Sequence, residues 1–188
     1  LQVQDARKPQ RLLQACLRLR PLPQLHRQLH LGLSENKTNI FHIVNPPLRS
    51  ESDRKALVKA LLDGTADVIS TDHAPHTLED KATGSPGFSG LETSFAVCNT
   101  VLVKQNGMKL KKLSELMSAK PAEILGIKDR GLLQEGFDAS LVLVDPDKQW
   151  TVRGEEFASK GKYTPLEGKK LTGTISATFL HGKIVYQE

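Results

Sequence analysis

From residue 38 the chain has a regular pattern of apolar and polar positions, which begins with two short apolar runs separated by a helical pattern. The runs TNIFHIV, 38–44, and ADVIST, 66–71, are rich in β-branched residues and predict buried strands. Between them, apolar positions fall at helical spacing over 54–62, with Ser50 or Ser52 as the N-terminal cap. A strand, a helix and a strand within about 35 residues predict a right-handed parallel βαβ unit.

Two longer helices and a group of strands are predicted after this unit. The helices cover 90–107 and 110–127, and we expect Pro121 to interrupt the second. The pattern then alternates like strands in three places: 139–145, 172–179 and 183–188. A tight two-residue turn, His181-Gly182, joins the last two strands into a hairpin. An α/β part is therefore followed by a small all-β part.

The first 37 residues differ in kind from these two parts, which we place at 38–131 and 132–188. Residues 1–37 are rich in arginine and glutamine, have no steady period, and are broken by Pro21 and Pro23. Two histidines in this stretch are four residues apart, but they lack the glutamate of a zinc-protease helix. We expect an atypical segment that is either out of frame with the rest or disordered.

Length and charge narrow the class of protein. A chain of 188 residues is long enough for one domain with a core, with or without a small appendage. The net charge of +5 resides in residues 1–33, where six basic residues face one acid, so 20 basic and 20 acidic residues remain over 34–188. A nucleic-acid face needs a basic patch on the folded part, so we expect no nucleic-acid partner.

The sequence also carries expectations about location. No apolar run approaches the ~18 residues of a membrane span, and no signal peptide is visible, so we expect no membrane partner. Cys16 and Cys98 are far apart and match no metal or disulfide spacing, which is typical of a reducing compartment. We therefore expect a cytoplasmic protein.

The stretch STDHAPHTLED, 70–80, gathers acids, two histidines and a proline directly behind the second predicted strand. Asp72 follows that strand, and Asn45 follows the first. Because the carboxyl ends of parallel barrel strands meet at one mouth, we expect both side chains to face it. A carboxylate there can ligate a divalent metal and accept a proton from metal-bound water, or it can merely cap the next helix.

His73 and His76 flank Ala74-Pro75, and the proline forbids a regular helix through both histidines. The two imidazoles therefore point in different directions. One can bond the backbone while the other reaches the mouth and holds a substrate carboxylate, although either can be purely structural. The glycine-rich loop 84–93 lets backbone groups approach a ligand, or is simply a surface loop, and it matches no phosphate-binding pattern.

Four segments carry a resemblance to a known family. They are VNPPLRSESDRKALVKALLDGTADVISTDHAPHTLEDK, GFSGLETS, DRGLLQEGFDASLVLVD and YTPLEGKKLTGTISATFLHGKIVY. Taken in order, they closely resemble the C-terminal part of bacterial class I dihydroorotases, which belong to the amidohydrolase superfamily. The resemblance covers about 38–188. Its motifs N-P-P-L-R and T-D-H-A-P-H are jointly specific, whereas the β-rich tail is shared by many amidohydrolases.

The resemblance implies an α/β fold, the C-terminal portion of a (β/α)8 metal-dependent hydrolase barrel plus a small β-sandwich appendage. It implies the reversible cyclisation of N-carbamoyl-L-aspartate to dihydroorotate, a step of pyrimidine biosynthesis, with one or two zinc ions. The partners that it implies are this small-molecule substrate and either a second copy of the chain or a transcarbamoylase.

The resemblance also assigns roles by motif position. Asp72 resembles the family acid that contacts the metal and acts as general base on the hydrolytic water, and as general acid in reverse. His76 resembles the histidine that grips the substrate, and Asn45 the asparagine that binds the pyrimidine ring. Gly87 falls where a loop glycine offers its backbone to the substrate. His73 also matches a family position, and we assign it a supporting role.

One departure from the family limits these expectations. Most of the family's metal ligands lie in upstream motifs that are absent from this sequence, and a catalytic zinc site needs about three protein ligands. We therefore expect a partial chain that is inactive alone. Two alternatives stay open: a non-catalytic dihydroorotase-like scaffold subunit, which the missing histidines favour, and an allantoinase or hydantoinase.

Overall fold

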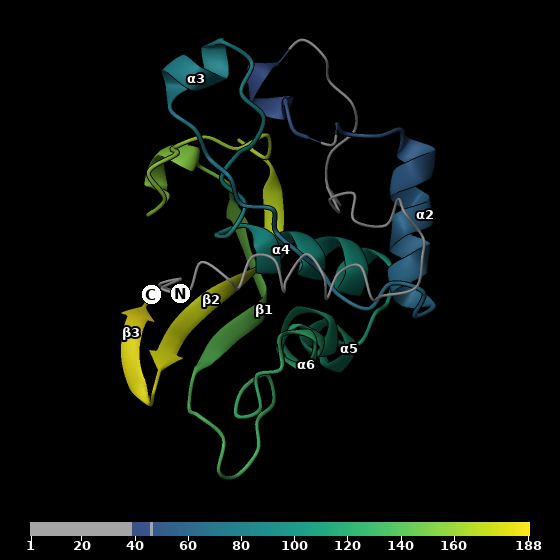
Figure 1. Ribbon diagram of the computed structural model, residues 1–188, viewed down its shortest axis with the longest axis vertical. Coiled ribbons are helices and arrows are strands. Elements are labelled where there is room, and N and C mark those ends of the chain that lie inside the picture. Colours follow the sequence, from purple (N-terminus) through teal and green to yellow (C-terminus); the bar gives the residue numbers. More distant parts are fainter. Residues whose placement is uncertain (1–38, 46) are drawn as a thin grey trace.

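The computed structural model describes residues 39–45 and 47–188. A small antiparallel sheet lies at one side of the fold, and α4 crosses beside it (Figure 1). Helix α2 lies on the far side of α4 from the sheet, and α3 lies at the opposite end from α6. None of the helices in the described ranges combines the length and the apolar character that crossing a membrane requires.

The sheet has three antiparallel strands in the order β1-β2-β3. The strands are β1, Leu141–Thr151, β2, Lys170–Leu180, and β3, Lys183–Gln187. The turn residues His181 and Gly182 have φ angles of 52° and 76°. Two positive φ angles in a two-residue turn define a type I′ hairpin, whose twist matches that of the strands. The three predicted strands and their hairpin turn are confirmed.

The predicted helix after residue 50 is also confirmed, as α2, Glu51–Leu62. Ser50 caps it, because its Oγ accepts a hydrogen bond from the Asp53 N–H at 3.3 Å, and Ser52 lies inside the first turn. Gly64, with φ of 82°, follows the helix end in the left-handed conformation that glycine adopts without strain.

Both longer helices form, although neither is regular throughout. The first consists of α4, Ser94–Cys98, followed by the π-helical η2, Asn99–Gln105. The second consists of α5, Leu110–Ser114, the π-helical η3, Glu115–Ala119, and α6, Lys120–Leu125. The predicted interruption at Pro121 is wrong. The π-helical turn directly before α6 changes the hydrogen-bond pattern where a proline would otherwise break the helix.

The predicted parallel βαβ unit is not formed. Residues 40–42 form the 3₁₀ turn η1, Ile40–His42, and 66–76 contain no assigned strand. The Ile69 N–H instead donates to the Leu116 carbonyl at 3.1 Å. Two parallel strands need neighbours on both sides to satisfy their backbone groups, and the described residues offer none. The barrel portion and the second sheet of a sandwich therefore stay predictions.

Short elements complete the fold around this region. They are α3, Leu78–Ala82, and the 3₁₀ turn η4, Gly154–Glu156. Thr77 caps α3, since its Oγ1 accepts a hydrogen bond from the Asp80 N–H at 3.1 Å. The expectation for residues 1–37 lies outside the described residues.

Two apolar clusters hold the described part together. One packs α2 against η2, α5 and η3, and its fully buried members are Leu61, Leu102 and Leu116. The other joins Val44 and Phe88 to Val152 and other residues of the β-rich part. The second cluster thus contains residues from both predicted parts. It packs the loops that follow the two expected strands against the segment between β1 and β2.

Cys98 lies in the first of these clusters and is expected to be inert in the folded chain. Its side chain is 3% exposed, and burial raises the pKa of the thiol to about 12. At pH 8 roughly one thiol in ten thousand would be ionised, and only the thiolate reacts readily. In a Cys16→Ser variant, a maleimide or disulfide reagent should label Cys98 only as fast as the chain unfolds. Rapid labelling without denaturant would contradict the burial.

Candidate functional site

Asp72 directly follows residues 66–71, which form neither helix nor strand, and it has an unusual backbone conformation. Its φ is 46°, in the left-handed region that residues with a Cβ rarely occupy. Aspartate and asparagine tolerate this region better than most residues, because their short polar side chains can bond locally. Strained backbone of this kind collects at functional sites.

The electrostatics of Asp72 suit a proton carrier. The residue is exposed, yet protein on one side removes part of the water around its carboxylate. This partial burial raises the pKa of Asp72, and no charge or hydrogen bond from the described residues offsets the shift. A carboxylate whose pKa is raised toward neutrality both accepts and releases a proton more effectively.

His73 joins two loops through hydrogen bonds to the backbone. Its Nδ1 accepts hydrogen bonds from the N–H groups of Gly90, at 3.1 Å, and Leu91, at 3.3 Å. A ring nitrogen that accepts two N–H groups carries no proton, which fixes the tautomer. The imidazole therefore ties the loop 84–93 to the loop 72–76. This geometry matches the reading in which one of the two histidines bonds the backbone.

His76 presents an exposed side chain on a tightly held backbone. Its N–H donates to the hydroxyl of Tyr163 at 2.6 Å, and the same hydroxyl donates to the His76 carbonyl at 3.1 Å. The imidazole lies on the exposed surface. The two histidines thus differ as the proline between them predicts, one bonding the backbone and the other facing solvent.

Gly87 lies where three segments meet. Its N–H donates to the Ile43 carbonyl at 2.9 Å, and the neighbouring Phe88 carbonyl accepts from the Ala74 N–H at 3.2 Å. Gly87 is buried with φ of 132°, and a Cβ on it would collide with the carbonyl oxygen of Ala74. Only glycine fits this position. Asn45, which is exposed, lies two residues beyond Ile43 along the first of these segments.

The Gly87 contact also restricts what this residue offers a ligand. Its N–H is already donated to Ile43, so the carbonyl oxygen is the backbone group that a substrate would meet. Taken together, the hydrogen bonds bring the segments of Asn45, Asp72 and Gly87 into one neighbourhood.

Lys81 supports this neighbourhood from inside, and its role was missed by the sequence analysis. Its side chain is 0% exposed, and Nζ donates to the carbonyls of Ile43, at 3.1 Å, and Ser85, at 2.8 Å. Nζ also lies 5.9 Å from the centroid of the Tyr163 ring, within cation–π range. Burial lowers the pKa of Lys81. The only signal in the sequence was its place at the end of the motif segment.

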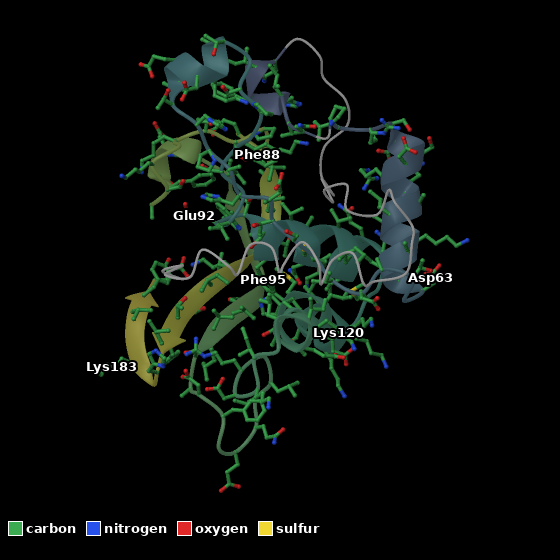
Figure 2. All side chains as sticks on the ribbon, viewed as in Figure 1. Asp63, Phe88, Glu92, Phe95, Lys120 and Lys183 are labelled. Atoms are coloured by element: carbon green, nitrogen blue, oxygen red, sulfur yellow. The ribbon has the colours of Figure 1, made fainter. Side chains whose placement is uncertain are left out.

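Glu92 gives a further link that the sequence analysis missed. Its carboxylate accepts the N–H groups of Ala158, at 2.8 Å, and Ser159, at 3.1 Å. Figure 2 shows Glu92 and Phe88 on the side of α4 that faces the segment between β1 and β2. The glycine-rich loop is therefore bonded at both ends, and is more than a plain surface loop.

A metal ion was expected at Asp72, and the donor set tests that expectation. Within the ranges 39–45 and 47–188, no group of three or more His, Cys, Asp or Glu side chains is placed to hold a metal ion. Because a catalytic zinc needs about three protein ligands, one carboxylate does not fit zinc by itself. His73 and His76 do not complete such a group with Asp72. The Nδ1 atom of His73 accepts two backbone N–H groups, and His76 is exposed.

Comparison with known proteins decides the family. Residues 25–185 match the sequence profile of the amidohydrolase family, a region that covers most of the chain. The chain belongs to the amidohydrolase family. The matched region of this amidohydrolase begins upstream of residue 38, where the recognised motifs begin.

Curated relatives of this amidohydrolase confirm the resemblance seen in its motifs. It is 47% identical over 159 residues to a dihydroorotase of Clostridium botulinum (strain Eklund 17B / Type B), covering 85% of this chain and 39% of that protein. It is 46% identical over 149 residues to a dihydroorotase of Bacillus subtilis (strain 168), covering 77% of this chain and 35% of that protein. The chain thus spans less than two-fifths of the length of these relatives.

Solved structures agree on the fold of this amidohydrolase. An L-hydantoinase from Arthrobacter aurescens superposes with a TM-score of 0.75 at 32% identity, over 85% of this chain and 36% of that one. A D-hydantoinase from a Thermus species gives the same TM-score at 27% identity, over 79% of this chain and 34% of that one. This chain therefore has the fold of the corresponding part of these two hydantoinases.

Proposed function

We propose that this chain supplies the C-terminal part of a zinc-dependent dihydroorotase, which interconverts N-carbamoyl-L-aspartate and dihydroorotate in pyrimidine biosynthesis. The observation that carries the proposal is the hydrogen-bonded convergence of the segments of Asn45, Asp72 and Gly87, in a chain 47% identical to a protein named dihydroorotase. A protein of this kind acts on a small-molecule substrate.

Asp72 is proposed as the catalytic acid and base. In hydrolysis, water adds to the ring amide carbonyl, and the carboxylate accepts the proton that the water loses. Asp72 then gives this proton to the leaving ring nitrogen as the C–N bond breaks, so protons balance and the carboxylate is restored. The same steps in reverse close the ring. The raised pKa of Asp72 favours both transfers.

Three residues are proposed to bind the substrate. His76, exposed on a fixed backbone, donates to the substrate carboxylate. Asn45 pairs with the amide groups of the ring, and the Gly87 carbonyl accepts from a ring N–H. Dihydroorotate carries a carboxylate that His76 would bind, whereas hydantoin carries no carboxylate. This group would therefore distinguish the two substrates.

Zinc enters the proposal only with further ligands from outside the described residues. Asp72 would be one ligand, and the bound metal would polarise the amide carbonyl and acidify water. The barrel over 38–131, the β-sandwich appendage within 132–188, a homodimer or transcarbamoylase partner, and a cytoplasmic location are likewise proposals.

The test joins this chain behind the upstream part of the Clostridium botulinum dihydroorotase and supplies zinc. The chimera is expected to hydrolyse dihydroorotate in preference to allantoin and hydantoin, whereas the chain alone gives no turnover. Turnover is followed by the loss of ring absorbance, and bound zinc is measured by atomic absorption.

Two results would contradict the proposal. Preference for hydantoin would favour a hydantoinase, the alternative that the L-hydantoinase structure supports. A folded chimera that binds zinc but turns over none of the three rings would favour a scaffold. A chimera of the same length that carries His76→Asn serves as the matched control for substrate binding.

A further inference from the structure

We propose that Tyr163 is a positioning residue that orients His76 toward the substrate from the segment between β1 and β2. The proposal rests on the function proposed above, in which His76 binds the substrate carboxylate. It adds a residue of the β-rich part to the site, and so makes that part necessary for substrate binding.

The hydroxyl of Tyr163 binds both backbone groups of one residue. It accepts from the His76 N–H at 2.6 Å and donates to the His76 carbonyl at 3.1 Å. The preceding residue is Pro75, which has no N–H, so the His76 N–H is the first donor of the loop after the proline. A part-buried N–H and carbonyl left without partners are costly, and one hydroxyl satisfies both.

The ring that carries this hydroxyl cannot easily move. Tyr163 is 5% exposed, and its ring stacks on Phe41 with centroids 5.0 Å apart at an interplanar angle of 27°. The Lys81 Nζ lies 5.9 Å from the ring centroid. Side chains locked by packing in this way hold the groups they bind within narrow limits.

The backbone beside Tyr163 also contacts the loops 84–93 and 72–76. The Gly161 carbonyl accepts a 2.5 Å hydrogen bond from the Ser89 hydroxyl, and the Ser89 N–H donates to the Tyr163 carbonyl at 3.4 Å. A Cβ on Gly161 would collide with the Pro75 ring. Residues 161–163 therefore lie directly against Pro75 and His76, and the two hydroxyl bonds are part of a close contact between segments.

The consequence for His76 follows from geometry. With its N–H and carbonyl both fixed, the direction in which the Cα–Cβ bond leaves the backbone is fixed too. Because misplacement of a binding group by about 1 Å can cost on the order of 100-fold, release of this backbone would weaken the grip on a carboxylate. It would leave the proton chemistry at Asp72 unchanged.

The test compares Tyr163→Phe with Tyr186→Phe, which alters the exposed tyrosine of β3. The first variant removes the hydroxyl and keeps the ring. In the 188-residue chain, we expect hydrogen exchange of the His76 amide to accelerate at least about tenfold in Tyr163→Phe and to be unchanged in Tyr186→Phe, because a hydrogen-bonded amide exchanges only on opening.

Kinetics of the chimera then show whether Tyr163 orients His76 for substrate binding or only stabilises the fold. Tyr163→Phe is expected to raise KM for dihydroorotate about tenfold, with kcat within about twofold, because binding is lost without loss of transition-state chemistry. Faster amide exchange with an unchanged KM would overturn the positioning role. Unchanged exchange would overturn the contact itself. An unchanged KM in His76→Asn would instead overturn the substrate-binding role of His76, and with it the proposed function of that residue.

Discussion

Replacement of Asp72 by asparagine is expected to remove turnover from the chimera and to raise the melting temperature of the chain at pH 7. The loss of turnover should be at least about 1,000-fold, because no proton carrier remains. The gain in stability has one cause: asparagine removes a carboxylate whose charge burial disfavours. Because asparagine tolerates the left-handed conformation as well as aspartate does, no added backbone strain offsets this gain.

The sign of the pH dependence follows from the direction of the shift. The folded pKa of Asp72 lies above its ordinary value of 3.8, so the folded state binds this proton more tightly than the unfolded state does. Stability from this group is therefore greatest below pH 3.8 and falls as the pH rises through the folded pKa. The melting temperatures of the two proteins should differ at pH 7 and converge near pH 3.

Asp72→Ala is the variant to compare with Asp72→Asn. It also removes the charge, but alanine tolerates a positive φ less well than asparagine does. It is expected to gain less stability than Asp72→Asn. An asparagine variant that is less stable than the parent at pH 7 would show that the carboxylate has a stabilising partner, and would remove the basis for its raised pKa.

The second large effect is expected at Gly87. Gly87→Ala should lower the free energy of unfolding by roughly 3 kcal/mol, since it combines backbone strain with a collision in a buried place. Gly84 provides the control in the same loop, because its φ of 95° is also positive but a Cβ there meets nothing within 4 Å. Gly84→Ala should cost about 1 kcal/mol from strain alone.

Urea unfolding of the three proteins measures this difference. In the chimera, Gly87→Ala should also raise KM, because a displaced loop moves the carbonyl proposed to meet the substrate. Equal losses in the two variants would show that the contact between Gly87 and Ala74 is looser than the structure indicates.

The elements that the sequence predicted correctly depend on local information. The helix after Ser50 needs only its cap and its apolar spacing, and the hairpin at His181-Gly182 needs only turn residues between alternating runs. The strands predicted at 38–44 and 66–71 depend on partners elsewhere in a sheet. The part of the chain that the structure describes offers them no such partners, and their backbone groups bond to loops and to a helix instead.

The site divides in the same way. Asp72, Asn45, His76 and Gly87 could be identified from motifs, and their roles stay predictions. Lys81 and Tyr163 escaped notice because their contacts span 38 and 87 positions along the chain. Both use a side chain to bind main-chain atoms of a distant segment, and no periodicity or spacing carries such a contact.

That preference for main-chain partners has an evolutionary consequence. Tyr163 and Lys81 bind main-chain atoms, so a substitution at position 76 or 43 by any residue other than proline leaves their hydrogen bonds in place. The side chain at position 76, proposed to meet the substrate, can then change without loss of the hydrogen bonds that orient its backbone.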